Sequence, residues 1–173
     1  MADFEIAFNR TMKSEGGYVL HTVPGDRGGM TYAGISRKYN PDWDGWACID
    51  SGEYESPELM DSVRSFYYDW YWRRIGGSDI DSQPIANVLF DFSVNSGVRT
   101  AVRLAQQVLG VPADGVIGSQ TIGAINSVDS DGFVSHYALA KVARYAAIVN
   151  RDRSQNKFLL GWVNRTLRDL ESA

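Results

Sequence analysis

Glycine residues mark the ends of most helical segments that this sequence predicts, and they constrain the fold more than any other feature. Phe4, Phe8 and Met12 recur at four-residue spacing, which predicts a helix over residues 3–15 that Gly16 and Gly17 stop. A chain made of helical segments that end at glycines is expected to be mostly helical. Further helices are expected over residues 57–74, 84–95, 98–109, 119–126, 131–151 and 155–171, of which the first three stop before Gly76, Gly97 and Gly110.

A short β element is expected between the first two helices. Residues 18–36 are rich in glycine and in β-branched or aromatic residues, with a turn sequence at 24–29. Residues 37–55 are expected to hold a short helical turn and a loop with Trp43 and Trp46. The predicted fold class is therefore α+β, mostly α-helical, with a small N-terminal β-hairpin or sheet. Two regions, residues 1–97 and 98–173, are expected to pack as one compact unit.

The composition of the 173-residue chain argues against several partners and cofactors. Its net charge of −4 argues against nucleic acid, because phosphate binding needs a basic surface. Cys48 is the only cysteine, so no internal disulfide can form, and folding in a reducing cytoplasm is expected. The spacing of His21, His136 and Cys48 matches no zinc site. No metal and no cofactor are therefore expected.

No targeting or membrane-spanning segment is expected from the N-terminal residues or from the apolar runs of the sequence. Residues 1–5 lack a basic segment followed by an apolar run, so no secretory signal peptide is expected. No apolar run approaches the ~18 residues of a transmembrane helix, so stable membrane insertion is not expected. We expect a monomer. Attraction to an anionic partner would have to be local, through the Arg-bearing segments at 64–74, 99–103 and 144–168.

Glu15 is the residue whose position most suggests catalysis. It follows Phe4 by eleven residues and Phe8 by seven, and both spacings return to within about 20° of one direction on a helix. A carboxylate that continues an apolar stripe at the negative end of a helix dipole has its pKa raised by burial and by the dipole. A general acid that works near neutral pH needs this shift. The alternative is a glutamate at a frayed helix end that points into water.

A second acid and a hydroxyl follow on the Gly-rich β element. Glycoside hydrolysis uses one carboxylic acid to protonate the leaving oxygen and an opposite carboxylate to activate water or stabilise the charged sugar. Asp26 is a candidate for that carboxylate, and the hydroxyl of Thr31 could hold the attacking water. The alternatives are that Asp26 only forms its turn and that Thr31 is an ordinary strand residue.

Some polar and aromatic residues have both a structural and a substrate-binding interpretation. Asp91 and Asn95 lie four residues apart on an otherwise apolar helix and so share a face. They would either line a sugar groove or brace neighbouring helices. We expect a structural role for Asp91 and substrate contact for Asn95. Trp43 and Trp46 would either stack on sugar rings or hold their loop in place.

These motifs resemble glycoside hydrolase family 108, the N-acetylmuramidases of phage endolysins and secretion-associated lysozymes. The family's Glu-Gly-Gly-Tyr is present at residues 15–18, Asp-x-Gly-Gly-x-Thr at 26–31 and Gly-Ile at 34–35. The resemblance continues through Pro41–Trp46, Phe66–Tyr68, Pro84–Asp91 and Asn95–Gly97, and residues 158–165 are similar to the family's C-terminal region. The stretch from Glu15 to Asp26 is longer than the commonest family pattern.

The resemblance implies a lysozyme-like fold with Glu15 as the single dominant catalytic residue. Residues 1–97 would form the catalytic region and residues 98–173 a predicted peptidoglycan-binding region. Residues 109–121 are similar to the turn of small peptidoglycan-binding modules, although turn chemistry explains much of that pattern without a ligand. Catalytic roles are predicted for Glu15, Asp26 and Thr31, and substrate-binding roles for Tyr18, Tyr32, Trp46 and Asn95.

The expected activity is hydrolysis of the β-1,4 bond between N-acetylmuramic acid and N-acetylglucosamine in peptidoglycan. The expected partner is therefore peptidoglycan, and the expected role is that of an endolysin that lyses the bacterial wall. The protein would wait in the host cytoplasm before its release to the wall or periplasm. Two alternatives are a lytic transglycosylase and a non-catalytic module that binds peptidoglycan or assists secretion.

Overall fold

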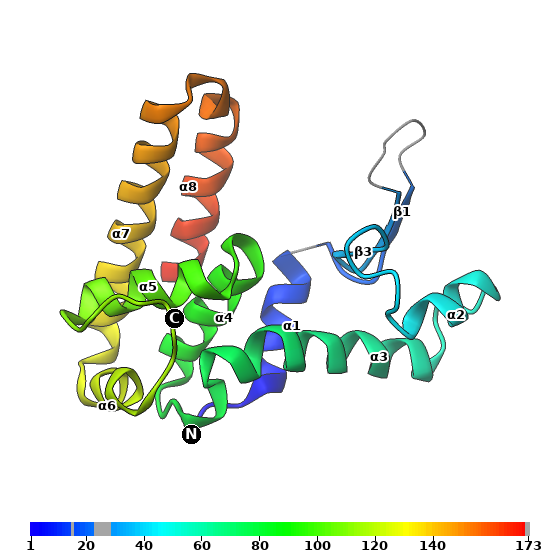
Figure 1. Cartoon of the computed structure of the whole chain (residues 1–173), viewed down its shortest axis with the longest axis horizontal. Helices are drawn as coiled ribbons and strands as arrows, with labels where there is room; N and C mark the ends of the chain where they lie inside the picture. The colour runs from blue at the N-terminus through cyan, green and yellow to red at the C-terminus, as the bar shows by residue number, and fades with distance from the viewer. Residues whose placement is uncertain (15, 23–28, 172–173) are drawn as a thin grey trace. The chain divides into compact units, whose positions relative to one another are not determined.

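The computed structural model describes residues 1–14, 16–22 and 29–171, and the chain folds into two compact units. The helical unit comprises Met1–Phe4 and Tyr71–Ala173, and the sheet unit comprises Glu5–Trp70. Figure 1 shows the elements of both units. The predicted boundary between residues 97 and 98 lies between α4 (Gln83–Ser96) and α5 (Val98–Leu109), both of which belong to the helical unit. The functional meaning of that boundary stays a prediction.

Three short antiparallel strands form the sheet that gives the sheet unit its name. They are β1 (Leu20–Thr22), β2 (Met30–Tyr32) and β3 (Ile35–Ser36), in the order β1-β2-β3. Tyr32 on the central strand pairs with Leu20 on one side and Ile35 on the other. The remaining elements of this unit are most of α1 (Phe4–Ser14), α2 (Gly45–Asp50) and α3 (Pro57–Tyr67). The predicted small N-terminal sheet is confirmed.

α3 begins where its sequence predicts. The Ser56 side chain accepts a hydrogen bond from the Leu59 N–H, and Pro57 occupies the first helical turn, where a missing N–H costs nothing. The face of α3 that carries Leu59, Val63 and Tyr67 is buried in the core. The Tyr67 ring packs edge-on against Phe8 of α1, with 5.6 Å between ring centroids.

The helix predicted over residues 57–74 changes its geometry near the middle, which corrects that prediction. α3 ends at Tyr67, a π-helical turn follows over Tyr68–Trp72, and a 3-10 turn covers Arg73–Ile75. Buried positions are therefore five residues apart at Tyr67 and Trp72, whereas an α-helix repeats every 3.6 residues. The wider turn lets Trp72 enter the core while Tyr68 and Trp70 stay exposed.

α4 forms the centre of the helical unit. Every residue from Ile85 to Ser93 is buried, as expected for a helix that neighbours cover on all sides. α5 and α7 (Ser130–Arg151) pack against α4, α6 (Ser119–Ser127) packs against α5, and α8 (Asn156–Glu171) packs along α7 (Figure 1). The glycine stops are confirmed at Gly76 and Gly110, which adopt left-handed conformations with φ of 64° and 70°.

A buried ion pair joins α7 to α8. Lys141 Nζ donates to Asp169 Oδ2 at 2.5 Å, and the two side chains are only 2% and 9% exposed. The Lys141 ammonium also lies over the Phe92 ring of α4, 5.1 Å from its centroid. A buried ammonium needs such partners, because an isolated charge in the interior costs several kcal/mol.

Replacing Asp169 with Asn should lower the free energy of unfolding by about 3–5 kcal/mol, because Lys141 would lose its counter-charge in a buried position. Urea unfolding followed by circular dichroism measures this change. Asp131→Asn is the matched control, because Asp131 is an exposed carboxylate in the first turn of α7 and should change stability by about 1 kcal/mol or less. Equal effects of the two substitutions would contradict a buried ion pair.

Candidate active site

The end of α1 is built from the residues that the sequence indicates. Phe8 and Met12 are 1% and 4% exposed and form the predicted apolar stripe. The Gly17 N–H donates to the Met12 carbonyl at 2.9 Å, and Gly16 and Gly17 have φ of 89° and 79°. This hydrogen bond joins residues five apart in the sequence, as in the motifs that commonly end a helix. Glu15 lies outside the described residues, so its raised pKa stays a prediction.

Thr31 and Tyr32 occupy the central strand, and their side chains point to opposite faces of the sheet. Tyr32 is 1% exposed, and its hydroxyl donates to the Tyr54 carbonyl at 2.8 Å. Thr31 is half-buried and pairs with His21 and Ser36 across the sheet. Tyr32 therefore anchors the sheet to the 51–56 segment while Thr31 occupies the other face. Asp26 lies outside the described residues.

The turn between β2 and β3 fixes the position of this strand. Ala33 and Gly34 both have left-handed backbones, with φ of 47° and 80°. Tyr67 of α3 donates its hydroxyl to the Ala33 carbonyl at 2.9 Å. A Cβ atom on Gly34 would lie 2.7 Å from that hydroxyl oxygen, so the tyrosine can approach only because residue 34 is glycine.

Tyr18, predicted to contact substrate, keeps a neutral phenol at physiological pH. Its side chain is 38% exposed. Burial raises its pKa, the Arg64 guanidinium opposes that shift, and the Glu5 carboxylate adds to it. Arg64 is itself ion-paired with Glu5. Tyr18 therefore offers a partly exposed hydroxyl that can donate or accept a hydrogen bond directly after the helix end.

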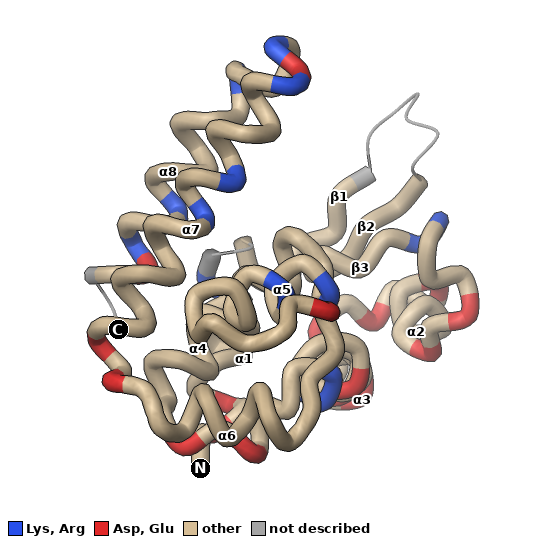
Figure 2. Tube along the Cα trace, turned by 60° about the vertical axis from the view of Figure 1, so that its left-hand side comes forward, with Lys and Arg blue, Asp and Glu red and all other residues tan. Residues whose placement is uncertain are grey.

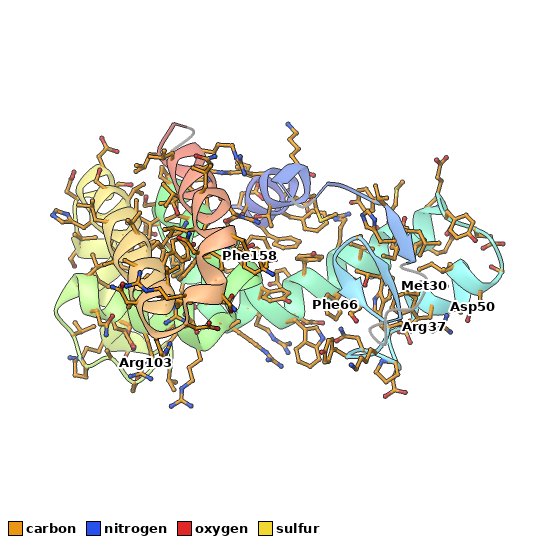
Figure 3. The ribbon with its side chains drawn as sticks, turned by 90° about the horizontal axis from the view of Figure 1, so that it is seen from above. Met30, Arg37, Asp50, Phe66, Arg103 and Phe158 are labelled. Carbon is orange, nitrogen blue, oxygen red and sulfur yellow. The ribbon has the colours of Figure 1, made fainter. Side chains whose placement is uncertain are left out.

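Trp46 lies in α2 and not in the predicted loop, which corrects that interpretation. It is 3% exposed, and its indole N–H donates to the Asn40 carbonyl at 2.7 Å. The Arg37 guanidinium covers its ring at 5.2 Å and makes two hydrogen bonds of 2.6 and 2.7 Å to Asp50 (Figure 3). These contacts leave no open ring face for a sugar, so Trp46 holds the 40–50 segment in place.

Beside Trp46 lies a pocket of about 460 Å³ within the sheet unit, here called the aromatic pocket. Phe66 and Trp70 lie four residues apart on one side, with 5.9 Å between their ring centroids, and Trp43 forms another wall. Aromatic ring faces can stack on the C–H faces of a sugar, and acceptor oxygens can bind its hydroxyl groups. Among these rings, the sequence suggests sugar stacking for Trp43 and a place on either a groove or the core for Trp70, but it gives no such indication for Phe66. The carboxylates that line this pocket are those of Asp42, Asp44 and Asp69.

Asp91 and Asn95 share one face of α4 in the helical unit, as their spacing predicts. The Asn95 amide donates to the Asp91 backbone carbonyl at 2.7 Å and lies 3.4 Å from Asp91 Oδ2. Arg165 of α8 makes two hydrogen bonds to the Asp91 carboxylate, Nη2 to Oδ1 at 2.9 Å and Nε to Oδ2 at 3.2 Å. The expected structural role of Asp91 thus has a definite form, which is an ion pair between α4 and α8.

A second pocket of about 190 Å³ opens beside this ion pair, here called the cationic pocket. α7 contributes residues that are spaced as on one helix face. The sequence predicts substrate contact for Asn95 and attraction to an anionic partner by the Arg-bearing segment 144–168, but it does not predict that Arg144 and Arg165 of that segment lie around Asn95. The polar and aromatic side chains that line the pocket include Asp91, Asn95, Lys141, Arg144, Trp162 and Arg165.

The Asp114-Gly115 turn is held by a buried glutamine. Gln106 is 1% exposed, accepts from the Gly115 N–H at 2.8 Å and donates to Asp114 Oδ1 at 2.9 Å. Hydrogen bonds from the Val116 N–H and from Gln106 lower the pKa of Asp114. The polar side chains of this motif are therefore used within the turn, in agreement with its structural interpretation.

Within the described residues, no three His, Cys, Asp or Glu side chains gather in a way that could hold a metal ion. No helix in the same part of the chain is both long and apolar enough to cross a bilayer.

Comparison with known proteins identifies the chain as a glycoside hydrolase joined to a peptidoglycan domain. It belongs to the family described as Glycosyl hydrolase 108, which it matches over residues 8–97. Residues 100–167 match a family described as Predicted Peptidoglycan domain. A search among curated proteins found no match. These family matches confirm the predicted membership and support a peptidoglycan hydrolase or peptidoglycan-binding role.

The chain is also similar to the solved structure of Brucella abortus SagA. The two are 25% identical, with a TM-score of 0.71, and the match covers 98% of this chain and 92% of SagA. The predicted fold class, α+β, mostly α-helical and lysozyme-like, is confirmed.

Gly34→Ala should destabilise the protein by more than Gly52→Ala. Both glycines have positive φ, 80° and 84°, so both alanine variants carry backbone strain of about 1–2 kcal/mol. Only the Gly34 variant also collides with the Tyr67 hydroxyl, because a Cβ on Gly52 would meet nothing within 4 Å. The difference between their midpoints in thermal unfolding measures the collision. Equal midpoints would show that Tyr67 moves away without cost.

Proposed function

We propose that the protein is an N-acetylmuramidase that hydrolyses the β-1,4 bond between N-acetylmuramic acid and N-acetylglucosamine in peptidoglycan. The observation that carries this proposal is the family match over residues 8–97, which spans Glu15, Asp26 and Thr31 in one stretch of chain. The peptidoglycan domain match over residues 100–167 supports the same substrate. The proposed site of action is the cell wall, where this polymer lies.

In the proposed mechanism, Glu15 donates its proton to the glycosidic oxygen as the bond between that oxygen and the anomeric carbon breaks. The sugar ring develops positive charge, which the Asp26 carboxylate stabilises. A water molecule, oriented by the Thr31 hydroxyl, adds to the anomeric carbon and gives up a proton to a carboxylate. The products are a new reducing end and a free hydroxyl group, and no cofactor takes part.

The described part of the sheet unit supports this assignment in two ways. The bond from Gly17 to Met12 ends α1 directly beside the position of Glu15 in the sequence, so the acid follows a helix with a buried stripe. Strand β2 presents Thr31 on the face opposite the anchored Tyr32. The endolysin role, storage in a host cytoplasm and the monomeric state stay predictions.

Glu15→Gln should reduce hydrolysis of purified sacculi by about 10²–10⁴-fold, because glutamine keeps the shape but cannot donate the proton. Release of reducing ends measures the rate. Glu53→Gln is the matched control, because Glu53 is exposed and far from Glu15 in sequence, and it should keep the original rate. Near-normal activity of Glu15→Gln would overturn the proposed acid. Mass spectrometry of the products separates hydrolysis, which adds water, from transglycosylase action, which leaves an anhydro sugar.

Thr31→Val should lower the rate by about tenfold, whereas Thr31→Ser should keep most of it, because only serine retains the hydroxyl that orients water. Valine suits a strand as well as threonine does, so β2 should stay intact. Reducing-end release measures both variants, and circular dichroism checks that both are folded. If the valine variant is as active as the serine variant, the hydroxyl plays no part in catalysis.

A further inference from the structure

We propose that the cationic pocket of the helical unit binds a carboxylate of peptidoglycan that lies next to an amide N–H. This rests on peptidoglycan being the ligand, as proposed above, but not on Glu15 being the acid. The pocket is formed by α4, α7 and α8. Its α4 wall lies in the segment that matches the hydrolase family, and its α7 and α8 walls lie in the segment that matches the peptidoglycan domain.

Two of the three cations in the pocket already have anionic partners. Lys141 is paired with Asp169, and Arg165 is held by two hydrogen bonds to Asp91. Arg144 is exposed, and no carboxylate in the described part of the chain forms an ion pair with it. The pocket therefore carries a surplus guanidinium, which is the side chain that best matches the planar geometry of a carboxylate.

The other walls indicate what accompanies the carboxylate. Asn95 uses its amide N–H on Asp91, and within the described residues its Oδ1 has no donor, so it can accept from a ligand N–H. Trp162 is half-buried and packs against Tyr145 and Phe158, with ring centroids 5.2 and 5.9 Å away. Its ring can cover an apolar or sugar portion of the ligand.

The size of the pocket limits the ligand to a single substituent. Its volume of about 190 Å³ is below the roughly 300–1,000 Å³ of sites that take a whole small molecule. Two groups of peptidoglycan have the required chemistry. One is the lactyl carboxylate of a muramic acid that bears no stem peptide, beside its acetamido N–H, and the other is the terminal carboxylate of a stem peptide beside its last peptide N–H.

The surrounding charge favours the same class of ligand. Figure 2 shows Lys and Arg gathered along α7 and α8. Residues 133–168 contain one acidic residue, Asp152, although the whole chain has a net charge of −4. A local positive field raises the concentration of anionic ligands near the pocket. The cationic residues of this segment are Lys141, Arg144, Arg151, Arg153, Lys157, Arg165 and Arg168.

Titrations of the full chain with two matched pairs of ligands test this proposal. N-acetylmuramic acid differs from N-acetylglucosamine only by its lactyl group, and D-alanyl-D-alanine has a charged carboxylate where its C-terminal amide has a neutral carboxamide. Two-dimensional NMR follows the indole N–H of Trp162, assigned with Trp162→Phe. We expect the carboxylate member of at least one pair to bind about tenfold more tightly, which corresponds to a charge-assisted hydrogen bond. The pair that shows the difference identifies the source of the carboxylate.

Arg144→Gln should remove this preference, whereas Arg151→Gln should keep it. Arg151 is also an exposed arginine of α7, seven residues further along, and it does not line the pocket. Thermal unfolding checks that both variants are folded. Equal binding within both pairs, or an unchanged preference in Arg144→Gln, would overturn the proposal. If Glu15→Gln loses hydrolysis but keeps the preference for the carboxylate ligand, carboxylate binding in the cationic pocket does not depend on the catalytic role of Glu15.

Discussion

The ion pair between Asp91 and Arg165 is the contact on which the organisation of the helical unit depends. It joins α4, in the segment that matches the hydrolase family, to α8, in the segment that matches the peptidoglycan domain. Asp91 is 3% exposed, so its carboxylate needs the guanidinium and the nearby Asn95 amide to compensate for lost water. The same ion pair forms one wall of the cationic pocket. It therefore fixes both the packing of α4 against α8 and the position of Asn95, which is hydrogen-bonded to Asp91.

The parts of the fold that the sequence predicts are those decided by local chemistry. Gly110 ends α5 because its φ of 70° is easy only for glycine, and Ser56 begins α3 because its side chain caps an N–H three residues away. The π-helical turn after Tyr67 and the helical, buried position of Trp46 could not be predicted in this way. Both depend on burial: Trp72 reaches the core only through a wider turn, and Trp46 is fixed by the Asn40 carbonyl.

In the candidate sites too, local sequence predicts some features, whereas others depend on tertiary packing. Tyr18, Thr31 and Asn95 stand in short motifs. The structure places Thr31 on β2 and Asn95 on α4, as their neighbours predict, and Tyr18 lies between α1 and β1. The sequence predicts only part of the aromatic pocket, because Trp43 and Phe66, which both line it, are 23 residues apart in the sequence. Arg165 lies 74 residues from Asp91, so no local pattern could link them. The helical spacing of Lys141 and Arg144 indicates that they share a helix face. Only tertiary packing shows that this face lines the same pocket as Asn95.

The two proposed sites would act on different parts of the reaction energy profile. A proton donated by Glu15 moves only as the glycosidic bond breaks, so its loss would lower kcat. A carboxylate held by Arg144 takes no part in bond breaking and keeps its charge in substrate, transition state and product. Its binding energy would therefore be nearly uniform along the reaction, which lowers KM and leaves kcat unchanged. A wall polymer offers many carboxylates, so a uniform contact would serve to retain the enzyme on its substrate between cleavages.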